Sequence, residues 1–216
     1  MDAHNISDDR KSAYVCSPKN FHAFGRYLTM LDYSIYFKHP DAFSAQSFEQ
    51  YCSSIGLHVK LYPSFNLLKD TGFLPIRLID ERFATNEGNH DFLSGFELYL
   101  SEYHHVIQSK EEEKGFFKKM FKTKPAPELP FDRAVKDTTW RLWLRCGMSD
   151  SFEMLLAYVF GAYFVKFCGG VFDDPQTGQF YDNFNHLESD IAEIIAALQE
   201  LKTTDELLTH KFDGWK

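Results

Sequence analysis

A run of twelve uncharged, mostly apolar residues, MLLAYVFGAYFV at 154–165, constrains the fold of this 216-residue chain more than any other stretch. It lies between Glu153 and Lys166. Because a bilayer core of about 30 Å requires about 20 residues, the run is too short to cross a membrane. The amino-terminal residues carry acids and lack the apolar segment of a signal peptide. The sequence therefore predicts a buried helix in a cytoplasmic protein without stable membrane insertion.

Cysteine usage agrees with that location. Cys16, Cys52, Cys146 and Cys168 are widely spread and form no C-x-x-C pair. Each occurs in an apolar or helical context, which is typical of buried free thiols. We therefore expect reduced cysteines, as in cytosolic proteins.

The first half of the chain contains most of the strand patterns, which are short segments rich in β-branched and aromatic residues. The predicted strands are 12–17, 34–38, 57–62, 72–79 and 93–107. Pro75 places the fourth of these at an edge or a bulge. Apolar spacings of three and four predict helices at 18–31 and 41–56, the second capped by Asp41 and ended by Gly56.

Helical patterns dominate the second half. They predict a helix at 131–147, the apolar helix capped by Ser149 or Ser151, and an amphipathic helix at 186–201 that begins near Asn185. Strands followed by helices indicate an α+β fold, with an antiparallel sheet mainly from the N-terminal half and helices mainly from the C-terminal half, on one face. We expect a single domain over 1–216. A possible subdivision has a strand-rich part at 1–109, a charged and Pro-rich linker at 110–130, and a helical part at 131–216.

The segment GGVFDDPQTGQFYDN at 169–183 joins the last two helices. A calcium loop starting at Asp173 would place Pro175 and Phe184 at ligand positions, so calcium is excluded. Pro175 suits a type I turn, and Gly178 can adopt the positive φ that closes a bulged loop. The segment therefore predicts a β-hairpin at 171–182 with exposed aspartates. Solvated carboxylates at a hairpin tip lack the contrast in burial that paired catalytic acids need.

Signatures of catalytic, metal and cofactor sites are missing. The sequence contains no H-E-x-x-H, no G-x-S-x-G and no G-x-G-x-x-G. His104 and His105 are adjacent, and adjacent residues on a strand point to opposite faces, so they would not share a metal. We therefore expect no catalytic residues, no metal and no cofactor.

The net charge of −8 arises entirely in the last third of the chain. Residues 1–146 contain 19 acids and 19 bases, whereas residues 147–216 contain 12 acids and 4 bases. An acidic face repels nucleic acid and favours a basic partner. The Lys- and Phe-rich stretch at 114–124 is the only candidate for binding nucleic acid, and no known motif accompanies it.

The pattern at 150–200, an apolar helix, GG, VFDDPQTGQFYD and then a capped amphipathic helix, resembles an element of bacterial immunity proteins from polymorphic toxin systems. The resemblance does not specify a subfamily. It implies a cytosolic, stoichiometric inhibitor that occludes the active site of a toxin with a basic surface. Phe180 and Tyr181 would supply contact area, and carboxylates would pair with Arg or Lys of the toxin. The predicted partner-binding residues are Asp173, Asp174, Tyr181, Asp182, Glu188, Asp190 and Glu193.

Two other functions stay open at this point. One is an enzyme of unrecognised, hydrolase-like family whose site is assembled only in three dimensions. The other is an adaptor or peripheral membrane protein that docks through the amphipathic stretch at 116–121. The identity of the toxin, the stoichiometry and the oligomeric state are left open by the sequence.

Overall fold

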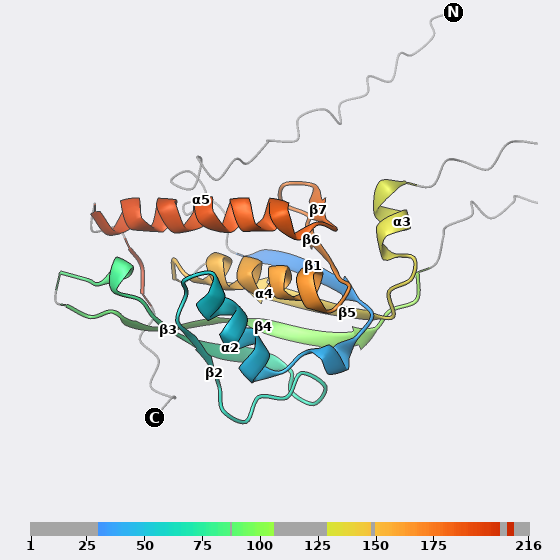
Figure 1. Cartoon of the computed structure of the whole chain (residues 1–216), viewed down its shortest axis with the longest axis horizontal. Coiled ribbons are helices and arrows are strands. Elements are labelled where there is room, and N and C mark those ends of the chain that lie inside the picture. The colour runs from blue at the N-terminus through green and yellow to red at the C-terminus, as the bar shows by residue number, and fades with distance from the viewer. Residues whose placement is uncertain (1–29, 87, 106–128, 148–149, 204–206, 210–216) are drawn as a thin grey trace, which may run out of the picture.

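The computed structural model describes residues 30–86, 88–105, 129–147, 150–203 and 207–209, whose helices and strands are arranged as in Figure 1. The strands are β1 (Leu31–Phe37), β2 (Val59–Leu61), β3 (Gly72–Ile79), β4 (Asp91–Glu102), β5 (Trp140–Cys146), β6 (Val171–Asp174) and β7 (Gln179–Tyr181). The helices are α2 (Ala45–Ser54), α3 (Pro130–Val135), α4 (Glu153–Phe167) and α5 (Phe184–Thr203), with short 3-10 turns η2 (Pro40–Ala42) and η3 (Glu81–Phe83). The predicted α+β class and the hairpin at 171–182 are confirmed.

The seven strands form one antiparallel sheet in the order β2-β3-β4-β5-β1-β6-β7. β1 is near the middle, where it pairs with β5 and β6. Strands from 31–102 and strands from 140–181 therefore contribute to the same sheet.

Strand register gives the sheet two different faces. On β1, Leu31, Tyr33, Ile35 and Phe37 are buried in the main core together with residues of α2, α4 and α5. The alternate residues Asp32, Ser34 and Tyr36 point to the opposite face, because successive strand side chains alternate. We call this opposite face the outer sheet face. In Figure 1, α5 lies alongside α4, whereas α3 lies apart from them beyond one end of the strands.

The apolar run forms α4, as predicted, and most of this helix is buried. It contacts β1, β4, β5 and β6, and α2 and α5 pack against it. Apolar residues surround most of its circumference, which is typical of a helix enclosed in a core. No helix within the described residues is long and apolar enough to cross a membrane.

The start of α2 differs from its prediction. Ser44, not Asp41, caps the helix, and its side chain accepts a hydrogen bond from the Ser47 amide while the Ser47 side chain bonds back to the Ser44 amide. Asp41 lies in η2, which precedes the helix. The helix ends as predicted before Gly56, which has φ 77°.

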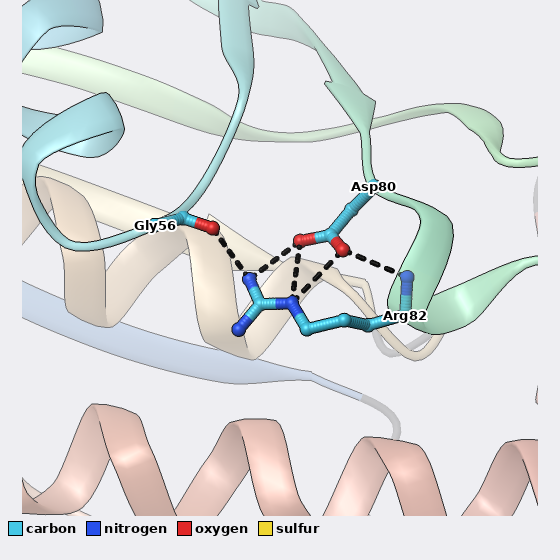
Figure 2. Close-up of polar contacts among 3 residues, drawn as sticks. All are labelled: Gly56, Asp80 and Arg82. Atoms are coloured by element: carbon cyan, nitrogen blue, oxygen red, sulfur yellow. Dashed lines mark hydrogen bonds and ion pairs between the residues drawn. The ribbon is translucent and has the colours of Figure 1, made fainter.

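The Arg82 side chain joins η3 to the turn after α2 through a hydrogen bond to Gly56, while it forms an ion pair with Asp80, as Figure 2 shows. The Arg82 Nη2 donates to Asp80 Oδ2 at 2.6 Å and to the Gly56 carbonyl at 2.7 Å, and Arg82 Nε donates to Asp80 Oδ1 at 2.9 Å. The Asp80 hydrogen bond raises the pKa of Arg82. Asp80 is buried, and the two-point contact with Arg82 supplies hydrogen-bond donors to both of its carboxylate oxygens there.

The helix predicted at 131–147 is wrong for most of its length. Only Pro130–Val135 is helical, and Trp140–Cys146 forms β5. The apolar residues of this segment fit both a helical spacing and the alternating spacing of a strand. The alternating residues Leu142, Leu144 and Cys146 face the core, and pairing with both β1 and β4 decides between the two patterns.

Other boundaries shift for similar reasons. β4 ends at Glu102, so His104 and His105 lie after the strand and not on it. β3 is an interior strand, but β2 pairs only with 76–78, so Pro75 lies just beyond that pairing. The predicted strand at 12–17 and residues 18–29 of the predicted helix lie outside the described residues, and Leu31 begins β1.

Candidate functional site

The predicted hairpin is held at one edge of the sheet. β6 pairs with β1 through Ser34↔Asp173, Ile35↔Phe172 and Tyr36↔Val171, and β7 forms the edge strand. Residues 175–178 make the turn, and Gly178 has the expected positive φ of 68°. The hairpin is therefore anchored by a central strand and leads directly into α5.

The predicted site residues fall into three groups by exposure. Asp182, Glu188 and Glu193 are exposed, whereas Asp173 and Asp190 are half-buried. Asp174 and Tyr181 are buried, with 2% and 6% of their surface exposed. The expectation that all three hairpin aspartates are exposed is therefore wrong for Asp174 and only partly met for Asp173.

Asp174 is buried because it closes the hairpin onto α4. Its Oδ2 accepts a hydrogen bond from the Tyr158 hydroxyl at 2.6 Å, and its Oδ1 accepts from the Gln176 amide at 2.9 Å. Burial raises the pKa of Tyr158, so the phenol keeps its proton and donates it. Asp174 therefore holds the turn against α4.

Asp173 lies on the outer sheet face beside charged neighbours. Burial raises the pKa of Asp173, the nearby Asp174 raises it further, and Arg141 opposes both effects. The register sets Asp173 beside Ser34, and the Arg141 guanidinium reaches the same Ser34, whose hydroxyl accepts from Arg141 Nη2 at 2.9 Å.

Tyr181 connects β7 to α5. Its hydroxyl lies 2.7 Å from Asp190 Oδ2 and 2.8 Å from Gln179 Oε1. Its ring packs against Tyr158 and Phe172, and burial raises its pKa. The hydrogen bond from its hydroxyl therefore positions the Asp190 carboxylate.

A groove of about 550 Å³ lies between the hairpin and the first turns of α5. Residues 178–181 form one wall, and His186, Ser189 and Asp190 form the other. Sequence reasoning missed Gln179, His186 and Ser189 as groove residues. The helical spacing of His186, Ser189 and Asp190 places them on one side of α5, but only the fold shows that β7 lies opposite them.

The start of α5 also differs slightly from its prediction. Asn183 Oδ1 accepts from the Asn185 amide, and the helix begins at Phe184. Leu187, Ile191, Ile194 and Leu198 are buried, as the apolar stripe predicts. Glu188 and Glu193 therefore lie on the solvent side of the helix.

A second group of buried acids lies at the start of α4. Asp150 Oδ1 accepts from the Ser94 hydroxyl at 2.8 Å and from the amides of Phe152 and Glu153 at 2.7 and 3.1 Å. Asp150 therefore satisfies two backbone amides at the start of α4, whose N-cap position is Phe152. Ser151 instead pairs with Leu208, and Ser149 lies outside the described residues. Asp150 precedes Glu153 by three positions, which is a capping-box spacing that could have identified it.

Burial, with a smaller contribution from the neighbouring Glu153, raises the pKa of Asp150 to about 6, against the effect of the hydrogen bonds. Its folded pKa lies above the ordinary value of 3.8, so the folded state binds the proton more tightly. Stability from this group is present below about pH 4 and is lost as pH rises through 6. A shift from 3.8 to about 6 corresponds to about 3 kcal/mol.

We therefore expect Asp150→Asn to change the pH dependence of stability. The free energy of unfolding of each protein is measured by urea unfolding at several pH values between 4 and 7. From pH 4 to pH 7, the unmodified chain should lose up to about 3 kcal/mol more than the variant does. The variant keeps a side-chain oxygen that can accept from the Phe152 and Glu153 amides. Parallel pH curves for the two proteins would contradict this assignment.

The described cysteines and histidines show no activated nucleophile. Cys52, Cys146 and Cys168 are buried and free, as predicted, and burial raises the pKa of each. Raised pKa values keep thiols protonated and unreactive. His105 has its Nδ1 3.2 Å from the Tyr103 hydroxyl and its Nε2 3.9 Å from Asp132 of α3. Cys16 lies outside the described residues, as does the basic stretch at 114–124.

Comparisons with known proteins add no relative. No family model, no curated protein and no solved structure matches the chain. The resemblance at 150–200 to immunity proteins therefore stays a prediction.

Proposed function

We propose that this chain is a non-enzymatic, protein-binding inhibitor of the immunity-protein type, acting in the bacterial cytoplasm on a toxin with a basic surface. The observation that supports the proposal is the distribution of charge on the hairpin and α5. Residues 171–203 contain seven acidic residues and one basic residue, Lys202. Asp182, Glu188 and Glu193 are exposed within this segment.

Such a surface suits a cationic partner. Exposed carboxylates of one sign steer the encounter with an oppositely charged protein and increase its association rate. The groove beside them gives a partner side chain a place to enter, and Asp190 on its wall can accept a bond from Arg or Lys. We call Asp182, Glu188, Asp190 and Glu193 the acidic surface.

Buried residues give this surface a fixed geometry. The Asp174–Tyr158 bond fastens the hairpin to α4, and the contact of Tyr181 with Asp190 joins the hairpin to α5. Binding then costs less conformational entropy, because the contacting groups are already ordered. In this proposal Asp174 and Tyr181 are positioning residues, and the exposed acids make the contacts.

The test is co-expression with the toxin encoded beside the gene, followed by measurement of rescue, stoichiometry and association rate. We expect rescue and a 1:1 complex. Charge reversal of Asp182, Glu188 and Glu193 to Lys should slow association at low salt by about 10-fold or more. The matched control reverses Asp41, Glu102 and Asp137, which are exposed carboxylates on other elements.

Two results would count against the proposal. Absence of rescue by the unmodified chain would reject the immunity function. Rescue with equal association rates for the two triple variants would keep the function and reject the acidic surface as its site.

A further inference from the structure

One edge of the sheet is open to further strand pairing. β7 is the last strand in the sheet order and pairs only with β6. In an antiparallel pair, successive residues direct their amide and carbonyl groups alternately toward the neighbouring strand and away from it. Either Phe180 alone or both Gln179 and Tyr181 therefore direct these groups away from β6. Within the described part of the chain, residues 179–181 form no backbone hydrogen bond outside the sheet.

The opposite edge of the sheet is protected by its own chain. β2 forms that edge, and the Leu61 amide donates to Glu49 Oε1 of α2 at 3.0 Å. Lys60 forms an ion pair with the same carboxylate at 2.7 Å. Charged side chains at an edge keep other strands from pairing there. No side chain among the described residues bonds to the backbone of β7 in this way, so β7 is the edge available for pairing.

The groove between the hairpin and α5 runs along this open edge. Residues 178–181 form one of its walls, and three residues of α5 form the other. Phe180 pairs with Asp173 and lies with it on the outer sheet face, whereas Gln179 and Tyr181 point to the opposite face. Because residues from both faces line the groove, it lies at the backbone edge of the strand. Its volume of about 550 Å³ falls within the range of about 300–1,000 Å³ for binding sites.

The α5 wall of the groove carries polar side chains that are available for binding. His186 and Ser189 are exposed, and neither side chain contacts another described residue. Asp190 Oδ2 lies 2.7 Å from the Tyr181 hydroxyl, whereas Asp190 Oδ1 has no hydrogen-bond partner among the described residues. A cationic group in the groove would therefore meet a carboxylate oxygen that Tyr181 holds in place.

Charge distinguishes between the extended chains that could pair with this edge. Residues 179–193 contain four acidic residues and no Lys or Arg. A second copy joined edge to edge would bring Asp182 and Asp190 of both copies toward one another, and such like-charge contacts are unfavourable. An extended segment with cationic side chains meets opposite charge along the whole groove. The charge of the edge therefore favours a basic segment of another protein.

We infer that β7 binds an extended segment of the partner, which adds a strand to the sheet. The identity of this partner rests on the proposed function, whereas the chemistry of the segment follows from the groove. Its side chains alternate between the two faces. Those on the side of α5 are cationic and reach Asp190, and those on the outer sheet face are apolar and lie beside Phe180, whose ring packs against Phe131 of α3. Backbone hydrogen bonds supply affinity, and the alternate side chains supply specificity.

A synthetic peptide tests the inference without any knowledge of the toxin. The probe is a heptapeptide of alternating valine and arginine, and its binding is followed through the backbone amide signals in the NMR spectrum of the full chain. We expect shifts that are confined to residues 178–193. Two control peptides should each bind about 10-fold more weakly or worse. One has glutamate in place of arginine, which reverses the charge, and the other is methylated on all its backbone nitrogens, which removes the hydrogen-bond donors.

Ser189→Trp tests the place of binding. An indole at this exposed position fills the groove without changing its charge, so the variant should bind the valine–arginine peptide about 10-fold more weakly or worse. The matched control is Ala196→Trp, since Ala196 is exposed on the same side of α5 two turns further along and does not line the groove. Its affinity should stay within about 2-fold of that of the unmodified chain. Circular dichroism checks that both variants are folded.

Several results would overturn strand addition at β7. They are no binding of the valine–arginine peptide at about 1 mM, equal binding of the N-methylated peptide, and equal affinity of the two Trp variants. Shifts at β7 that depend on chain concentration without peptide would instead assign this edge to a second copy.

Rescue from the toxin separates this inference from the proposed function. Peptide binding at β7 without rescue by the unmodified chain supports strand addition and rejects the immunity function. Rescue to the same extent by Ser189→Trp and Ala196→Trp, without peptide binding, keeps the immunity function and rejects strand addition.

Discussion

Replacing Asp174 by Ala is expected to lower the free energy of unfolding by about 3 kcal/mol. The Tyr158 hydroxyl and the Gln176 amide would lose their acceptor, and the buried hydroxyl would have no water to replace it. Hydrogen bonds to a carboxylate contribute more than neutral ones, and unsatisfied buried donors add a further cost. Urea denaturation measures the change.

The matched control for this prediction is Asp182→Ala. Asp182 belongs to the same hairpin but is exposed, so its replacement should change stability by no more than about 0.5 kcal/mol. Similar losses for the two variants would mean that Asp174 does not anchor the hairpin. Tyr158→Phe, which removes the donor, should cost less than Asp174→Ala because it leaves Gln176 bonded.

The second large effect is expected for Gly95→Ala, which should lower the free energy of unfolding by about 3 kcal/mol or more. Gly95 has φ 153°, and a Cβ there would lie 2.0 Å from the Leu74 carbonyl oxygen. Gly95 and Leu74 both lie in the paired part of β4 and β3, so the backbone of neither residue can move away without disturbing the sheet. Thermal or urea unfolding of the purified variant measures the loss.

Gly178→Ala is the control that separates the cost of the close contact from the cost of a positive φ angle. Gly178 also has a positive φ, 68°, but no atom lies within 4 Å of a Cβ added there. The expected cost is therefore only the conformational one of about 1–2 kcal/mol. If Gly95→Ala were no worse than Gly178→Ala, the close approach of the two strands would be less rigid than described.

Local patterns were sufficient to predict much of the fold. The apolar run of α4, the stripe of α5 and the Pro175–Gly178 turn each determine their own conformation, because caps, turn residues and periodicity act within a few residues. The pattern at 140–146 did not, because its apolar spacing fits a helix and a strand equally. Pairing with β1, more than 100 positions earlier in the chain, decides the outcome there.

The candidate site was predictable in composition but not in exposure. Its acids follow directly from the sequence, and Asp182, Glu188 and Glu193 are exposed as expected. Asp174 differs because its burial depends on Tyr158, a residue on another element whose hydroxyl reaches the turn. The outer sheet face could not be foreseen either, since β5 was assigned to a helix.

The position of β1 in the sheet has a consequence during synthesis on the ribosome. β2, β3 and β4 can pair with one another as they emerge, but β1 must wait for β5 and β6, because Leu31 pairs with Cys146 and Tyr36 with Val171. At 5–20 residues per second the delay is roughly 10 s. Throughout it the nascent chain presents LDYSIYF, an aromatic segment with one charge, and such segments aggregate when unpaired. Production of this protein in cells should therefore depend on chaperones that shield the first strand until the last third of the chain has been made.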